Sequence, residues 1–163
     1  MRKDTLSLIV ATILWGITFV VVKKGVEAYH PVSFLFLRFS ITFLVLTVFM
    51  ALTKRKIKNE IFVKGLILGI FLFFGYILQT VGLKYTTPSK SAFLTSLFVL
   101  FTPFISFFIL KTKIKFRTVL AVILASAGIY LMFGLSIDTI NIGDILTILC
   151  AVSWAFHIVF VGL

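Results

Sequence analysis

Long apolar stretches, separated by short polar or basic segments, make up almost all of this chain. The stretches run from Leu6 to Val22, Ser33 to Leu52, Gly65 to Leu83, Ser91 to Leu110, Thr118 to Leu135 and Ile142 to Leu163. About 20 apolar helical residues cross the hydrocarbon core of a bilayer. The period-two alternation of a barrel strand is absent, so the spans are expected to be helices. The pattern predicts an all-α, polytopic transmembrane helix bundle with five complete spans and a sixth at the C-terminus.

Basic residues are concentrated in the segments between these stretches. The chain has 16 Lys and Arg against 5 Asp and Glu, a net charge of +11. Eleven of the basic residues fall on one side of the predicted bundle and four on the other. The positive-inside rule therefore predicts a cytoplasmic N-terminus in a multi-pass protein of the cytoplasmic (inner) membrane. Because the charge is divided among short loops, we expect membrane lipid and not nucleic acid as a partner.

Catalytic and metal-binding patterns are missing from the sequence. The single cysteine, Cys150, has no partner for an intramolecular disulfide and no metal-ligand neighbours. No nucleophile pairs with a histidine and a carboxylate, and no glycine-rich phosphate loop follows a strand. We therefore expect a protein that is not an enzyme and that uses no cofactor and no metal.

The sixth apolar stretch resembles the first. Asp4-Thr5-Leu6-Ser7 and Asp144-Ile145-Leu146-Thr147 open the two stretches, and Trp15 aligns with Trp154 if one residue is skipped. Five spans separate the two openings, and an odd repeat in one chain is inverted in the membrane, as in many secondary transporters. We therefore predict a first five-helix repeat over residues 1–137 and the start of a second, truncated repeat over 138–163. A complete six-span protein, or a homo-oligomer in place of the missing half, is the alternative.

Several motifs resemble the EamA-type members of the drug/metabolite transporter superfamily. They are Trp15-Gly16, Phe36-Leu37-Arg38-Phe39 after Pro31, the stretch from Tyr76 to Pro103, Ala125 to Leu131, and Gly143-Asp144 through Trp154. Thr112-Lys113 departs from the Glu-Arg that the family commonly has after its fourth helix. The resemblance implies a ten-helix permease for small metabolites or drug-like compounds, working by alternating access as a gradient-driven exporter. A non-transporting membrane scaffold, or an inactive fragment of a longer transporter, is the alternative function.

Two ionisable residues lie inside the predicted spans. Arg38, in the second, is suited to a carboxylate or phosphate of a substrate, or it extends along the bilayer to the outer interface. His157, in the sixth, is a candidate substrate-facing or proton-coupled group, or a neutral histidine hydrogen-bonded between helices. In both cases the structural alternative is favoured.

Uncharged polar and aromatic residues form helical stripes that suggest a substrate cavity. Tyr76 and Gln79 share a face of the third span, and Trp15 and Trp154 are aligned by the repeat. In the fourth span the stripe consists of Ser91, Thr95, Thr102 and Ser106. The alternative for all of them is helix–helix packing, in which small and polar residues are common.

Proline and glycine positions predict two further features. Pro103 lies midway along the fourth span, where it removes a backbone hydrogen bond, and it is the candidate hinge. Gly65-x-x-x-Gly69 predicts a close helix–helix contact in the third span.

Overall fold

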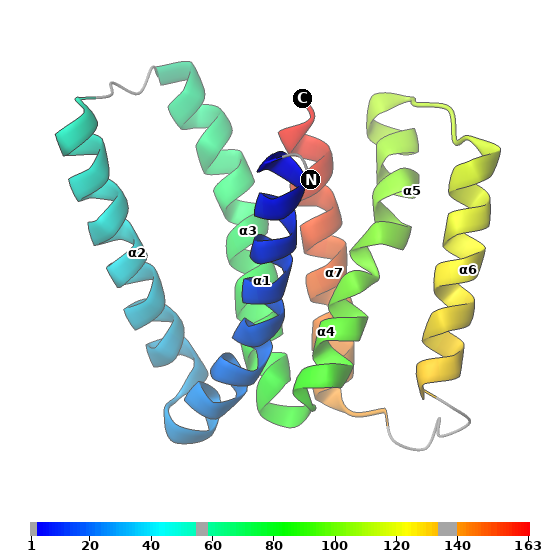
Figure 1. The fold of residues 1–163 in the computed structure, drawn as a ribbon, viewed down its shortest axis with the longest axis horizontal. Helices are drawn as coiled ribbons and strands as arrows, with labels where there is room; N and C mark the ends of the chain where they lie inside the picture. Colours follow the sequence, from blue (N-terminus) through cyan, green and yellow to red (C-terminus); the bar gives the residue numbers. More distant parts are fainter. Residues whose placement is uncertain (1–2, 55–58, 134–139) are drawn as a thin grey trace.

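A computed structural model describes residues 3–54, 59–133 and 140–163 (Figure 1). These residues form seven α-helices and no β-strand. The helices are α1 (Lys3–Ala28), α2 (Pro31–Thr53), α3 (Asn59–Tyr85), α4 (Pro88–Ser96), α5 (Phe98–Leu110), α6 (Phe116–Phe133) and α7 (Ile142–Val161). The all-α fold predicted from the sequence is confirmed.

Five segments of the described chain are long and apolar enough to cross a membrane. They are α1, α2, α3, α4 together with α5, and α7. The sixth apolar segment is α6, and the span predicted from Thr118 to Leu135 extends past its end into residues outside the described part. The predicted multi-pass membrane architecture is therefore confirmed for these five segments.

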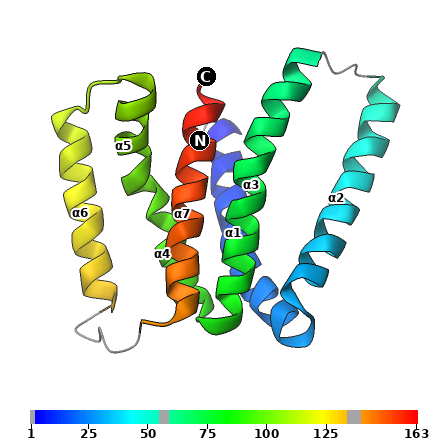
Figure 2. The same ribbon diagram turned by 180° about the vertical axis from the view of Figure 1, so that it is seen from behind.

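Helix α7 lies at the centre of the bundle, beside α3 and the α4–α5 span, while α2 and α6 lie at opposite edges (Figure 1). Figure 2 shows the same order from behind. The end of α7 lies near the start of α1, so these two helices run in opposite directions. Buried residues make up 44% of the most apolar part of α7 but only 11% of that of α1. The helix at the start of the predicted second repeat is thus the best packed one.

Glycines allow α7 to lie directly against α3. A Cβ atom at Gly82 would lie 2.8 Å from the carbonyl oxygen of Gly143, and a Cβ at Gly143 would collide with the carbonyl oxygen of Gly82. At Gly75, a Cβ would lie 3.1 Å from the Nε1 atom of Trp154. The two helices therefore meet at a distance that only glycine permits at these positions.

The ends of α1 and α3 that the charge distribution assigns to the outer side are packed together. Phe19, Val22 and Val26 of α1 form a buried cluster with Leu83 of α3. The Lys23 ammonium donates to the carbonyl oxygens of Leu83 (3.0 Å) and Lys84 (3.3 Å) at the end of α3. These carbonyls have no partner within their helix, so the lysine satisfies them as a C-terminal cap.

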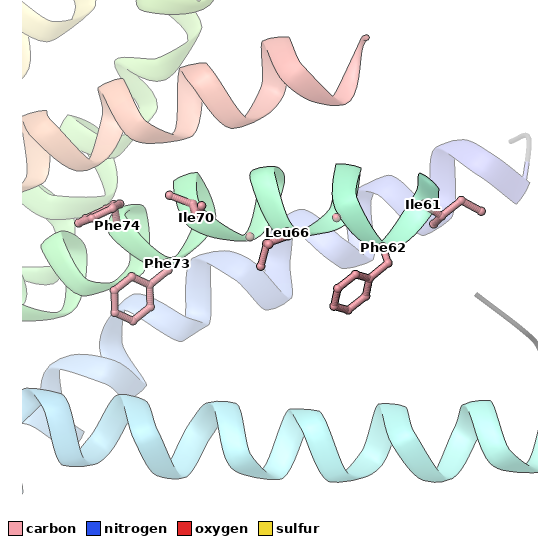
Figure 3. Close-up of a pocket in the computed structure, with 8 residues that line it drawn as sticks. Ile61, Phe62, Leu66, Ile70, Phe73 and Phe74 are labelled. Atoms are coloured by element: carbon pink, nitrogen blue, oxygen red, sulfur yellow. The ribbon is translucent and has the colours of Figure 1, made fainter. Parts of the chain in front are cut away.

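Toward the opposite end, α2 and α3 diverge (Figure 1). An apolar groove of about 640 Å³ follows α3 there, and Figure 3 shows Phe62 and Phe73 directed from it toward α2. Gly65 and Gly69 line this groove, and no described atom lies within 4 Å of a Cβ built at either. The close contact predicted for this glycine pair is therefore wrong within the described chain, because α2 diverges from α3 along this groove.

Candidate substrate site

Aromatic rings from several helices meet at Trp154, near the middle of α7. Its ring centroid lies 5.4 Å from that of Trp15 in α1 and 5.3 Å from that of Tyr76 in α3. Phe98 of α5 stacks parallel to Trp15 at 6.4 Å, and Phe39 of α2 meets Tyr76 edge-on at 5.3 Å. We call these five residues the aromatic cluster. It joins all three aromatic residues that the sequence nominated, and adds Phe39 and Phe98, which lie outside the predicted stripes.

A groove opens beside one end of the aromatic cluster. It has a volume of about 360 Å³ and separates one face of α1 from α4 and the start of α5. Its walls combine aromatic rings with small and hydroxyl-bearing residues: Thr12, Trp15, Gly16, Phe19, Ala92, Thr95, Ser96 and Phe98. No residue of this lining is charged. The groove is therefore suited to an apolar or aromatic group with a few hydrogen-bonding atoms.

Arg38 reaches the opposite end of the aromatic cluster from α2. Its guanidinium carbon lies 4.9 Å from the centroid of the Tyr76 ring, a cation–π geometry. The side chain thus extends to α3 within the bundle, whereas the favoured sequence interpretation had it extend to the outer interface. The side chain is half-buried, and no described carboxylate forms an ion pair with it.

The predicted polar stripes of α3 and α4 contact each other, and the stripe of α4 also contacts α7. The Gln79 amide nitrogen donates to the Thr95 hydroxyl at 3.1 Å, and the Ser91 and Thr147 hydroxyls lie 3.4 Å apart. All four residues are buried. Thr147 was not nominated from the sequence, although it stands one turn after the predicted helix start. These bonds join three helices, so the four side chains have a packing role whether or not a substrate reaches them.

His157 bonds to the backbone of a neighbouring helix. Its Nδ1 atom lies 3.0 Å from the carbonyl oxygen of Leu68 in α3. One turn earlier, the Ser153 hydroxyl donates to the carbonyl oxygen of Phe71 at 2.7 Å. His157 also meets the edge of Trp154, with ring centroids 5.9 Å apart. This geometry corresponds to the histidine hydrogen-bonded between helices, the alternative that the sequence favoured.

The sequence missed a buried ion pair between α4 and α7. Asp144 is 2% exposed, and its carboxylate binds the Lys90 ammonium and accepts from the Thr86 hydroxyl at 2.6 Å. It also accepts from the Asn141 N–H at 2.9 Å, while its own N–H donates to the Asn141 side chain at 3.2 Å. Lys90 is one of the four basic residues that the charge distribution places on the outer side, and Asp144 was predicted as part of the opening of the sixth apolar stretch. The signal was Asn141 three residues before Asp144, which is the spacing of a helix capping box.

The helix of the α4–α5 span is interrupted before its proline. At the interruption, Leu97, the N–H groups of Leu97 and Leu100 donate to the carbonyl oxygens three residues earlier in the chain. Pro103, the predicted hinge, lies inside α5, six residues beyond the turn. The interruption divides the predicted stripe: Ser91 and Thr95 are buried in the core, while Thr102 and Ser106 line a separate groove facing α6. The interruption of the helix therefore lies on the N-terminal side of Pro103, and the hinge at Pro103 stays a prediction.

Metal-binding clusters are absent from the described part of the chain. No three His, Cys, Asp or Glu side chains of residues 3–54, 59–133 and 140–163 lie close enough to share an ion. The buried Cys150 is a free thiol.

Comparison with known proteins identifies the family. The model of the EamA-like transporter family matches residues 3–134. An uncharacterized transporter of Archaeoglobus fulgidus is 37% identical over 157 residues, which cover 96% of this chain and 48% of that protein. The uncharacterized transporters YoaV and YyaM of Bacillus subtilis are 28% and 31% identical, over 98% and 90% of this chain and 57% and 51% of their own lengths. No solved structure matches the chain.

The chain spans about half the length of the curated relatives that it matches. The family model nevertheless covers most of the 163 residues, including the parts of α1, α2, α3 and α5 that form the aromatic cluster. The matched region ends before α7, the helix that carries Trp154. This chain belongs to the EamA-like transporter family.

Proposed function

We propose that this protein is an integral membrane permease for small metabolites or drug-like compounds. It works by alternating access as a gradient-driven exporter of the cytoplasmic membrane, with its N-terminus in the cytoplasm. The observation that carries the proposal is the aromatic cluster, in which rings from five helices meet around Trp154 beside an uncharged groove. Family membership supports transport over a scaffolding role.

The arrangement of the helices supports alternating access. The predicted outer ends of α1, α3, α4 and α7 are tied by Lys23 and by the Lys90–Asp144 pair. At the other end α2 and α3 diverge (Figure 1). A bundle closed at one end and open at the other is the form that a rocking-bundle transporter takes on one side of its cycle.

Exchange across a reconstituted membrane tests the proposal. The intact gene product is placed in liposomes loaded with a panel of amino acids, nucleosides and aromatic amphiphiles, and uptake of each labelled compound is followed. We expect faster uptake of at least one class than in protein-free liposomes. Trp15→Ala should abolish this uptake because it removes a wall of the groove, whereas Phe108→Ala, at a position that is 77% exposed and outside the groove, should not.

Two outcomes would contradict the proposal. Exchange of no panel member would favour the non-transporting scaffold. Equal uptake by the Trp15→Ala and Phe108→Ala variants would show that a transported compound passes elsewhere.

A further inference from the structure

Arg38 is a cation inside a membrane-spanning helix and forms no ion pair with a carboxylate of the described residues. The carboxylates of Glu27, Glu60 and Asp144 are bound by Lys23, Lys64 and Lys90, respectively. No described acidic side chain pairs with the guanidinium, which rests on the Tyr76 ring. A cation in a membrane span is costly, and such residues are usually found where a partner or a substrate compensates them.

A second donor lies beside the same turn of α3. The Nε1–H group of Trp154 is buried and has no oxygen or nitrogen acceptor among the described residues, where the polar group beside it is the Cys150 thiol, a weak acceptor one turn earlier in α7. Trp154 itself is only 8% exposed. Its Nε1 atom lies close to Gly75, 3.1 Å from the position that a Cβ would take there, and Tyr76, with Arg38 over its ring, follows directly in the chain. An indole nitrogen can donate a hydrogen bond but cannot accept one.

Both of these groups are donors only. Arginine, like the indole nitrogen, can donate a hydrogen bond but cannot accept one. A ligand that completes such a site supplies oxygen acceptors and a negative charge. Because a single guanidinium faces the cluster, one negative charge balances it, whereas a phosphate dianion would leave excess charge within the membrane.

We propose that the substrate is an organic monocarboxylate with a flat, apolar body. Its carboxylate binds at Arg38 and the Trp154 N–H, and its body stacks on the rings of the aromatic cluster. This inference rests on the proposed function, since it names the substrate class of the same site. It goes further in predicting that a neutral analogue of equal size binds weakly.

The test compares 3-phenylpropionate with its neutral isostere 3-phenylpropionamide. Both tryptophans of the chain, Trp15 and Trp154, belong to the cluster, so their fluorescence reports binding to the purified, full-length protein in lipid nanodiscs. The tryptophans are excited at a wavelength that phenyl rings do not absorb, so neither probe contributes to the fluorescence. We expect the carboxylate to bind about tenfold more tightly than the amide, the size of one charge-assisted hydrogen bond.

Variants then assign the preference to Arg38. Arg38→Gln should remove the preference for the carboxylate, and Arg38→Lys should retain part of it because the charge remains. Lys24→Gln removes the same charge from an exposed position and should keep the full preference. Thermal unfolding of each variant, followed by the reaction of the buried Cys150 with a thiol dye, distinguishes weak binding from loss of fold. The preference of the wild-type protein for the carboxylate needs no variant, so it tests the inference even if the variants fail to fold.

The inference is overturned if the amide binds as tightly as the carboxylate, if neither binds, or if Arg38→Gln keeps the preference. These results leave the proposed function standing when the reconstituted protein still exchanges a neutral compound. Failure of the exchange assay together with tight carboxylate binding would instead remove transport and keep the anion site.

Discussion

At the scale of single residues, glycine positions determine where two helices of this bundle pack backbone against backbone. Gly82 and Gly143 bring α3 and α7 together, whereas Gly69, in the same helix as Gly82, faces an open groove. The same residue type therefore has opposite sensitivities at two positions of one helix. This difference can be measured because Cys150, the only cysteine, is fully buried between the packed helices and reacts with a thiol dye only when they open.

We expect Gly82→Ala to destabilise the protein and Gly69→Ala to leave its stability unchanged or slightly raised. The added methyl group at Gly82 would lie 2.8 Å from a backbone oxygen and 2.9 Å from the Thr147 hydroxyl. Overpacking of this kind costs about 1–3 kcal/mol, whereas alanine at an open helical position is favoured over glycine. The temperature at which Cys150 becomes reactive to the thiol dye measures the stability of both variants. Equal behaviour of the two variants would contradict the close α3–α7 contact.

The residues of the site were only partly predictable. Helical spacing put Tyr76 and Gln79 on one face, and the repeat aligned Trp15 with Trp154, so local patterns predicted these four residues of the site. Their partners depend on which helices pack together. The stacking of Phe98 on Trp15 and the pairing of Lys90 with Asp144 join residues far apart in sequence, and a single sequence, unlike an alignment, contains no signal for such pairs.

At the scale of the elements, hydropathy located the five spans that the described structure confirms, because a bilayer sets the length of the helices. The same pattern did not locate the turn at Leu97, since the residues on both sides of it are equally apolar. It also gave no sign that Asp144 is buried, because hydropathy rates a carboxylate as exposed whether or not a lysine neutralises it. The described structure uses this pair to hold the start of α7 against the start of α4.

Lys90→Met should destabilise the protein by about 3 kcal/mol or more, because it leaves a buried carboxylate without its cation. The double variant Lys90→Met/Asp144→Asn should recover part of this loss, since asparagine keeps the helix cap without the charge. The control is Lys64→Met, which breaks the exposed Lys64–Glu60 pair and should cost almost nothing. Reactivity of Cys150 during heating measures all three. Equal effects of the two single variants would show that the buried pair stabilises nothing.

At the scale of the whole molecule, α1 and α7, which the sequence predicts to be repeats of each other, have unequal surroundings. They run in opposite directions, as an inverted repeat requires, and Trp15 and Trp154 lie side by side in the aromatic cluster. However, Trp154 is 8% exposed because α3 covers it, whereas Trp15 is 39% exposed. Inverted symmetry predicts that a third helix of a second repeat covers Trp15 in the same way. The curated relatives, about twice as long, have the length for such a repeat.

The predicted orientation can be checked in intact cells. With Cys150 replaced by alanine, Lys24→Cys should react with a membrane-impermeant maleimide from outside, because the positive-inside rule assigns that end of α1 to the outer side. Lys54→Cys, in the basic segment after α2, should react only after the membrane is opened. The reverse result would invert the topology and with it the direction of transport.

The central claim is that transported compounds pass through the groove beside the aromatic cluster. Gly16 lines this groove and Gly128 lies on α6, and no described atom is within 4 Å of a Cβ at either position. The most direct test is the rate of substrate exchange in proteoliposomes containing Gly16→Trp or Gly128→Trp. If the groove is the route, Gly16→Trp fills it and reduces exchange to the level of protein-free liposomes, while Gly128→Trp keeps the wild-type rate. An unchanged rate in a folded Gly16→Trp variant would contradict the account.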